Sequence, residues 1–218
     1  MPVNRPKAWG ARPASGRITE FRDRRRVLIL CEDSKSACLY FKGFKLDESR
    51  IDVRTKGTGM NTVSLVQEAI NLKEEAVRSR EPFYRIWCVF DRDSFPPQHF
   101  NRAFQLAKDN RISVAWANEA FELWYLLHFN YHDTGMCRSA YGGLLSKYLK
   151  CKYDKADDQI HAKLERHQPL AMKHARRLEK HWFEMGGCNP ESANPSTNIH
   201  KLVEFLNEFK DIGPADSD

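Results

Sequence analysis

The sequence predicts an α/β fold with a mostly parallel four-stranded sheet flanked by helices. Two continuous apolar runs, RVLILC (26–31) and YRIWCVF (84–90), are typical of strands buried on both faces of a parallel sheet. Strand and helix patterns then alternate up to about residue 130, as crossover helices between parallel strands require. Only helical patterns follow residue 135, so we expect a C-terminal helical extension packed on the sheet.

Each expected element is bounded by a change in hydrophobic spacing or by a turn signal. The expected strands are residues 26–31, 51–55, 84–90 and 112–117. The expected helices are residues 34–46, 62–80, 98–110, 119–129, 140–150, 156–166, 168–186 and 197–210. Asn194–Pro195 stops the chain before the last helix, which Ser196 or Thr197 can cap.

The excess positive charge is concentrated ahead of the first strand. The 218 residues contain 35 Lys and Arg against 29 Asp and Glu, a net charge of +6. Residues 1–26 hold eight basic and two acidic side chains, so this segment carries the whole excess. A neutral body excludes a uniformly basic, histone-like protein. We predict a flexible basic arm (1–25), an α/β core (26–135), the helical extension (136–210) and an acidic tail (211–218).

The chain lacks the sequence signals of export and membrane insertion. No run approaches the roughly 18 apolar residues of a membrane span. The apolar stretch Val27–Cys31 is too short for the core of a signal peptide, and no such core precedes it. The sequence therefore predicts a cytoplasmic protein with no membrane partner.

Acidic residues follow three of the expected strands. Glu32 follows the first strand, Asp91 and Asp93 follow the third, and Glu122 lies one turn into the helix after the fourth. Carboxyl ends of parallel strands meet at one edge of a sheet, where functional groups gather. Carboxylates held close together repel unless a cation lies between them, and Mg²⁺ prefers oxygen ligands. The pattern favours a metal site, although an isolated Asp-x-Asp is more often a solvated pair or a helix cap.

Each of these acids has an alternative structural interpretation. Glu32 is either a metal ligand or general acid/base, or it complements the dipole of the helix that follows. Glu122, within the apolar sequence AFELW, needs a cation or a hydrogen-bond partner. We expect Glu119 to be an exposed residue of the first helical turn.

Basic and glycine-rich segments border the same predicted edge of the sheet. Lys35, Lys56 and Arg92 are candidates for contact with a nucleic-acid phosphate, or ordinary surface residues. Residues 57–59 form a glycine-rich stretch before a helix, where backbone N–H groups can cradle a phosphate. No Walker A motif follows, so we do not predict ATP hydrolysis by this chain.

A second basic surface is expected on the helix 168–186. Its candidate nucleic-acid-binding residues are Lys173, Arg176, Arg177 and Lys180. His167, His174 and His181 recur every seven residues and share one helical face. This helix is either a surface for a phosphate backbone or a solvated face.

Several segments together carry a family resemblance. They are VLILCEDSKSACLYF (27–41), KGTGMNTVSLVQEA (56–69), WCVFDRDSFP (87–96), ANEAFELWYLLHF (117–129), KYDK (152–155) and NPSTNIHKLVEFL (194–206). The chain resembles RloB-like proteins, a branch of the Toprim-fold families found with bacterial restriction and abortive-infection loci. One departure is that residues 34–37 replace a glycine that many Toprim sequences carry after the strand-terminal Glu.

The resemblance implies a Toprim-like core in which Glu32, Asp91 and Asp93 support Mg²⁺-dependent (or Mn²⁺-dependent) chemistry at phosphodiesters. Glu122 corresponds to a further acidic position of the family. The expected function is a metal-dependent nuclease acting on DNA or RNA in a phage-defence or restriction-associated system. Alternatives are a non-catalytic nucleic-acid-binding or signal-sensing subunit, and a phosphotransferase or primase-like enzyme. The resemblance also implies an ATPase partner protein, and a homo-oligomer is left open.

Overall fold

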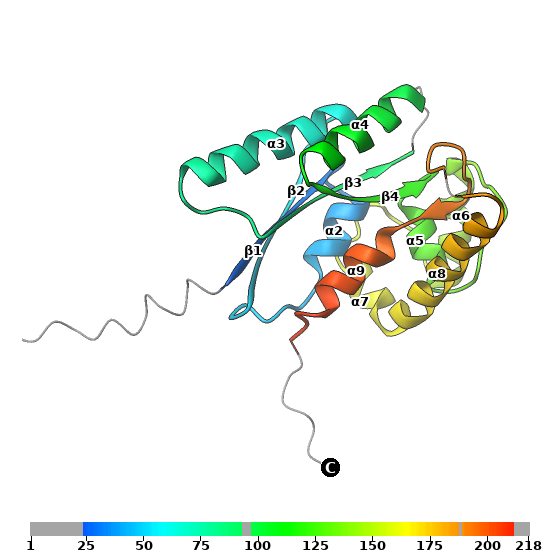
Figure 1. Cartoon of the computed structure of the whole chain (residues 1–218). Coiled ribbons are helices and arrows are strands. Elements are labelled where there is room, and N and C mark those ends of the chain that lie inside the picture. Colours follow the sequence, from blue (N-terminus) through cyan, green and yellow to red (C-terminus); the bar gives the residue numbers. More distant parts are fainter. Residues whose placement is uncertain (1–23, 93–96, 188, 212–218) are drawn as a thin grey trace, which may run out of the picture.

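A computed structural model describes residues 24–92, 97–187 and 189–211, which form a helix-flanked sheet (Figure 1). The sheet has five strands in the order β2-β1-β3-β4-β5. Its strands are β1 (Arg25–Cys31), β2 (Ile51–Gly57), β3 (Arg85–Asp91), β4 (Ser113–Asn118) and β5 (Ser196–Thr197). The first four are parallel, as predicted, and β5 pairs antiparallel with β4. Residues 1–23 and 212–218, most of the predicted arm and tail, lie outside the described residues.

The prediction of four strands is wrong, because the sheet also contains the short strand β5. Thr197 pairs with Ala117 and Ser196 pairs with Asn118, so the residues expected to cap the last helix belong to the sheet. The Thr197 hydroxyl donates to the backbone oxygen of Trp116 at 2.7 Å, which ties β5 further to β4. A strand of two residues is too short to show an alternating pattern, so hydrophobic periodicity could not reveal it.

Helices cover both faces of the sheet (Figure 1). They are α2 (Ser36–Lys42), α3 (Thr62–Arg78), α4 (Pro97–Asp109), α5 (Glu122–Leu127), α6 (Arg138–Leu149), α7 (Ile160–Leu164), α8 (Gln168–Glu184) and α9 (Ile199–Asn207), with a 3-10 turn at Glu165–His167. Helices α3 and α4 lie on one face, and α2, α5 and α9 lie on the other. No helix in the described part of the chain has the length and hydropathy needed to cross a bilayer.

The continuous apolar run of β1 serves two separate cores. Leu28 and Leu30 pack with α3 and α4, whereas Val27 and Ile29 pack with the helices of the opposite face. Successive side chains of a strand point to opposite faces, so a strand covered on both sides must be apolar throughout. The second core extends to Phe209, so it includes residues from both sides of the predicted boundary at 135. That domain division stays a prediction.

The order of the strands creates a switch point between β1 and β3. From β1 the chain moves through α2 to β2 on one side, then returns through α3 to β3 on the other side of β1. In open α/β sheets, ligands bind in the crevice outside the strand carboxyl ends at such a point. The topology therefore singles out the ends of β1 and β3.

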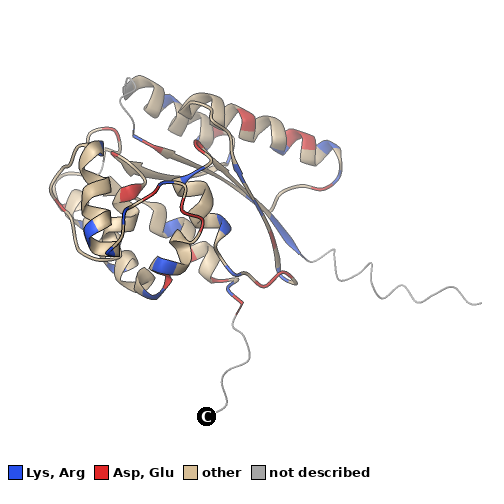
Figure 2. Ribbon diagram, turned by 180° about the vertical axis from the view of Figure 1, so that it is seen from behind, with Lys and Arg blue, Asp and Glu red and all other residues tan. Residues whose placement is uncertain are grey.

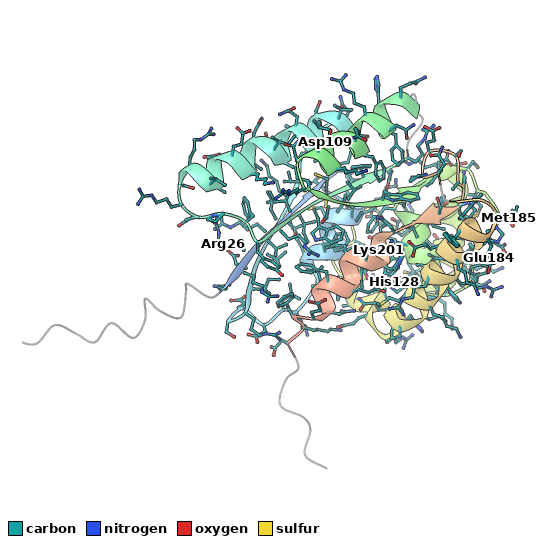
Figure 3. All side chains as sticks on the ribbon, viewed as in Figure 1. Arg26, Asp109, His128, Glu184, Met185 and Lys201 are labelled. Atoms are coloured by element: carbon teal, nitrogen blue, oxygen red, sulfur yellow. The ribbon has the colours of Figure 1, made fainter. Side chains whose placement is uncertain are left out.

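His128 is a titratable residue inside the second core (Figure 3). It is 0% exposed, and its Nδ1 lies 2.9 Å from the backbone oxygen of Trp124, to which it can only donate. The rings of Trp124 and Tyr40 pack against it. Burial lowers the pKa of His128 from 6.5 to about 3, because a charged imidazole would lose its hydration there. The folded protein therefore holds a neutral His128 at pH values where the unfolded chain binds a proton.

We expect the free energy of unfolding to fall by about 2 kcal/mol between pH 7 and pH 5 through His128 alone. Below the unfolded pKa the unfolded chain takes up a proton that the folded protein does not, so acidification favours unfolding. His128→Asn keeps an amide donor for the Trp124 oxygen but cannot titrate. Urea denaturation at both pH values should show a smaller pH effect in the variant, and an equal effect in both proteins would contradict this account.

Candidate active site

Three strand ends bring acidic residues into one cavity at the switch point. Glu32 follows β1, Asp91 is the last residue of β3, and Glu122 begins α5 shortly after β4. All three line a cavity with a volume of about 560 Å³. The predicted convergence of these acids is therefore present in the fold. Asp93 lies outside the described residues.

Backbone hydrogen bonds hold Glu32 at the junction of β1 and β3. Its own N–H donates to the backbone oxygen of Val89 at 3.0 Å, which continues the strand pairing by one residue. Its Oε2 accepts from the backbone N–H of Asp91 at 3.3 Å. The Glu32 carboxylate therefore lies beside the end of β3 and does not extend into solvent as a simple helix-dipole residue would.

Asp91 is a carboxylate in a restricted, electrostatically crowded position. Its side chain is 16% exposed, and Nη2 of Arg138, the first residue of α6, donates to its Oδ2 at 2.9 Å. Burial raises the pKa of Asp91 well above its ordinary value, and the charges of Glu122 and Glu32 raise it further, while Arg138 opposes them. A cation near these carboxylates would relieve both the burial cost and the mutual repulsion.

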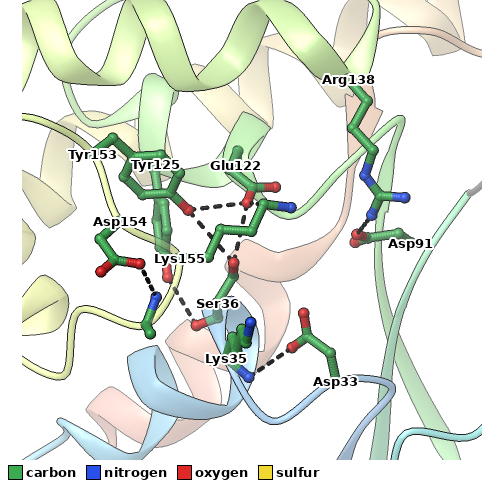
Figure 4. A network of polar contacts seen from close by, with 11 residues as sticks. Asp33, Lys35, Ser36, Asp91, Glu122, Tyr125, Arg138, Tyr153, Asp154 and Lys155 are labelled. Atoms are coloured by element: carbon green, nitrogen blue, oxygen red, sulfur yellow. Dashed lines mark hydrogen bonds and ion pairs between the residues drawn. The ribbon is translucent and has the colours of Figure 1, made fainter.

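Glu122 is 2% exposed and lies at the centre of a polar network (Figure 4). Its Oε1 accepts from Ser36 Oγ at 3.1 Å and from the Tyr153 hydroxyl at 2.9 Å. Lys155 Nζ lies 3.2 Å from the same oxygen. Tyr125 donates its hydroxyl to the backbone oxygen of Ser36 at 2.8 Å and so ties α5 to the start of α2.

Tyr153 stays protonated in this network. Burial raises the pKa of its hydroxyl, and the charge of Glu122 raises it further. The hydroxyl is therefore available only as a neutral donor near neutral pH. The Tyr153 hydroxyl and Lys155 Nζ both contact Glu122 Oε1. One carboxylate therefore holds two residues of the segment between α6 and α7.

The cavity combines oxygen ligands suited to a divalent cation with two competing cations of the chain itself. The carboxylates of Glu32, Asp91 and Glu122 are of the type that Mg²⁺ prefers. Within the ranges the structure describes, no group of three or more His, Cys, Asp or Glu side chains is spaced to hold a metal ion. Arg138 and Lys155 instead pair with Asp91 and Glu122, so a metal ion would compete with these two side chains.

A comparison with protein-family models decides the family. The model described as RloB-like protein matches residues 27–206. The chain belongs to the RloB-like family. The matched range contains all of the acidic residues of the cavity, and also Arg138, Tyr153 and Lys155. A search of curated proteins finds no match to the chain.

The sequence did not single out the residues of the extension that pair with the cavity's acids in this RloB-like chain. Arg138, Tyr153 and Lys155 come from α6 and the segment after it, where no strand end or regular spacing marks them. The only signal was the KYDK segment of the family resemblance, which contains Tyr153 and Lys155. Glu119, expected to be exposed, is half-buried, and its Oε2 has no hydrogen-bond partner among the described residues.

The predicted phosphate cradle at residues 57–59 has a different role. Thr58 N–H donates to the backbone oxygen of Cys31 at 3.0 Å, and Gly59 N–H donates to that of Glu32 at 2.8 Å. A Cβ on Gly57 would lie 2.3 Å from the Cα of Ser34. These donors and this glycine hold the turn that carries Glu32, so the prediction of a backbone phosphate cradle is wrong.

The three basic residues predicted at the rim do not line the cavity. Lys35 is exposed beside it, and its backbone N–H donates to Asp33 Oδ1 at 3.1 Å. Lys56 Nζ lies 3.6 Å from Glu68 Oε1 on α3. Arg92 Nε donates to the backbone oxygen of Glu191 at 3.1 Å. Their predicted nucleic-acid contacts stay predictions.

The basic residues of α8 are exposed, and none of them lines the cavity. Arg176 Nη2 lies 2.7 Å from Glu204 Oε1 of α9, and the Arg177 guanidinium lies 4.0 Å from the ring centroid of Tyr131. Lys180 Nζ lies 3.6 Å from Glu184 Oε1, and Lys173 is exposed on the same helix. Nucleic-acid binding by these four residues stays a prediction.

The histidines of α8 and its preceding turn pack largely inward. Nδ1 of His174 lies 2.8 Å from the backbone oxygen of Leu127, at the end of α5. The ring of His167 packs against Phe129 with centroids 5.6 Å apart. His167 and His174 therefore hold α8 and its preceding turn against the end of α5 and the residues after it. They form neither a surface open to a phosphate backbone nor a solvated face.

Proposed function

We propose that this chain is a Mg²⁺-dependent nuclease that hydrolyses phosphodiester bonds of DNA or RNA. We further propose that it has a Toprim-like core and acts in a bacterial phage-defence or restriction-associated system. The observation that carries the proposal is the convergence of Glu32, Asp91 and Glu122 in one cavity at the switch point of the sheet. Arg138 and Lys155 supply positive charge at the same place.

In this proposal Glu32, Asp91 and Asp93 hold Mg²⁺ (or Mn²⁺), and Glu122 is the candidate ligand for a second ion. When bound, the ion supplies charge neutralisation at the phosphate and lowers the pKa of a coordinated water. Glu32 has the alternative role of a general base that takes the proton from water. The hydrogen bond of 3.3 Å from the Asp91 N–H holds the Glu32 carboxylate beside the end of β3, where it lines the cavity.

The chain's own cations recognise the phosphodiester. Arg138 is 39% and Lys155 is 46% exposed, so both side chains can exchange their carboxylate partners for a phosphate oxygen that enters the cavity. The Arg138 guanidinium can donate two parallel hydrogen bonds to a phosphate. The protonated Tyr153 hydroxyl is a further donor beside them.

The alternative function is a non-catalytic nucleic-acid-binding or signal-sensing subunit. It is favoured by one observation, namely that Asp91 and Glu122 each pair with a cation of the chain itself. Such pairs satisfy the buried charges without a metal ion. The two proposals differ in whether the cavity binds a divalent cation and cleaves a phosphodiester.

The substitution Glu32→Gln, with Glu75→Gln as its matched control, tests the proposed activity. Glu75 is exposed on α3, so the control makes the same chemical change away from the cavity. Labelled single-stranded and duplex RNA and DNA are incubated with Mg²⁺, Mn²⁺ or EDTA. We expect metal-dependent cleavage by the native chain, a loss of about a hundredfold in Glu32→Gln, and native cleavage in the control. Cleavage that survives EDTA or the Glu32 substitution would contradict the proposal.

The resemblance also carries proposals about location and partners. We propose action in the cytoplasm with an ATPase partner protein, since RloB-like genes neighbour ATPase genes in some loci. A homo-oligomer is the remaining proposal. Co-purification of the ATPase with the chain, followed by sedimentation of the complex and of the chain alone, tests both.

A further inference from the structure

We infer that the end of the sheet opposite the cavity binds single-stranded nucleic acid through arginines stacked on aromatic rings. The surface lies where β1 and β3 begin and where α9 ends. We call it the arginine–aromatic platform, and it consists of Arg25, Arg50, Tyr84, Arg85, Phe205 and Phe209. The inference rests on the proposed function to the extent that both assign a nucleic-acid ligand to the chain.

Each arginine of the platform lies over a ring. The Arg25 guanidinium carbon is 4.6 Å from the Tyr84 ring centroid and 5.3 Å from that of Phe209. The corresponding carbon of Arg50 is 5.2 Å from the Phe209 centroid. That of Arg85 is 4.9 Å from the Phe205 centroid. Such stacking fixes the guanidinium planes while their N–H edges stay available for phosphate.

The platform has two buried aromatic rings and one exposed ring. Phe205 and Phe209 are 6% and 2% exposed, so they anchor the surface to the core. Tyr84 is 52% exposed, and its ring is nearly parallel to that of Phe205, at an interplanar angle of 18°. An exposed aromatic ring beside planar cations is the arrangement on which unpaired bases stack.

The arginines of the platform form no ion pair with the described part of the chain. There, no carboxylate lies within ion-pair distance of Arg25, Arg50 or Arg85, whereas the neighbouring Arg26 pairs with Glu81. Asp47 feels the charge of Arg50, but its carboxylate accepts hydrogen bonds from Ser49. The guanidinium edges can therefore receive an external anion.

The basic N-terminal segment continues directly from the platform. Residue 25 begins β1, so residues 1–24 are attached at this end of the sheet, where Arg26 is labelled in Figure 3 and basic residues colour the start of β1 in Figure 2. Residues 1–26 carry the whole net charge of +6. Dense basic charge favours a polyanion through counterion release. An acidic polypeptide would use this charge but would leave the exposed ring of Tyr84 without a role.

The platform and the cavity contact different nucleotides of the same nucleic-acid strand. Strand β1 runs from the platform to Glu32 over seven residues, a length of about 20 Å. A strand bound at the platform thus reaches the cavity only with nucleotides some distance further along. The platform supplies affinity, and the cavity supplies the proposed chemistry.

Binding is measured without metal, so that failure of this inference is distinguishable from failure of the nuclease proposal. The full chain is titrated in EDTA against a fluorescently labelled single-stranded RNA or DNA, and anisotropy is recorded at low and moderate salt. The platform variant replaces Arg25, Arg50 and Arg85 with Gln. The matched control replaces the exposed residues Arg102, Lys147 and Arg166 with Gln and so changes the net charge equally. Tyr84→Ser removes the ring alone.

We expect the platform variant to bind roughly tenfold or more weakly than the control, with a smaller salt dependence. Tyr84→Ser should lose about fivefold or more, the size of one lost stacking contact. Thermal melting curves check that the variants fold, and replacement of the three arginines with Lys retains charge but loses planar stacking. Equal binding by the platform and control variants would overturn the inference, as would displacement of the oligonucleotide by polyglutamate at the same charge concentration.

Discussion

Replacing Asp91 with Asn is expected to lower metal-dependent phosphodiester cleavage by roughly a hundredfold or more. Asp91 ends β3 inside the cavity, next to Glu32, and its carboxylate is the one whose pKa rises through burial and through Glu122 and Glu32. Asparagine keeps the shape of the side chain but removes its negative charge. Initial cleavage rates at saturating Mg²⁺ measure the effect.

The same substitution should leave the fold intact. In the native chain the charged form of Asp91 is disfavoured by burial, so a neutral amide removes a cost at neutral pH. The lost ion pair with Arg138 matters little, because Arg138 is 39% exposed and can be hydrated. We expect the free energy of unfolding to change by about 1 kcal/mol or less. A variant that cleaves normally would contradict the assigned role, and one that unfolds would show a structural role instead.

Replacing Arg138 with Gln is expected to change metal binding and cleavage in opposite directions. The guanidinium lies 2.9 Å from Asp91 Oδ2 and competes there with a divalent cation. Its removal should tighten Mn²⁺ binding by about tenfold, since one nearby positive charge is lost. Cleavage at saturating Mn²⁺ should nevertheless fall by about a hundredfold, because the phosphate loses a charged donor.

Isothermal titration with Mn²⁺ and cleavage rates measured on one preparation separate these two effects. Arg102→Gln is the matched control, since Arg102 is exposed on α4 away from the cavity. If Arg138 only holds the fold together, the metal affinity and the cleavage rate will fall in parallel. If the cavity is a non-catalytic binding site that needs no metal, Mn²⁺ will bind neither protein.

The sheet and the acidic residues of the site were predictable because both depend on local pattern. Runs such as RVLILC indicate a strand covered on both faces, and an acid directly after such a strand must lie at the sheet edge. Glu32 and Asp91 therefore could be placed from residue order alone. Strand β5 could not, because two residues carry no periodicity and its position depends on tertiary contacts with β4.

The partners of these acids were not predictable because they reach the cavity through the fold of the extension. Ser36 and Tyr153 meet at Glu122 although they are 117 positions apart in the chain. The glycine-rich stretch 57–59 was misinterpreted for a related reason. A glycine is needed wherever two backbones approach closely, and at Gly57 the second backbone belongs to the turn after β1 and not to a ligand.

Anomalous diffraction from crystals grown with Mn²⁺ and a non-cleavable oligonucleotide shows directly whether the cavity binds a divalent cation beside a phosphodiester. We expect a Mn²⁺ peak at the switch point, coordinated by Asp91 and by at least one of Glu32 and Glu122, with Arg138 turned from Asp91 toward a phosphate. An ordered oligonucleotide in the cavity with no anomalous peak near Asp91, and with Arg138 still paired to it, would contradict the account.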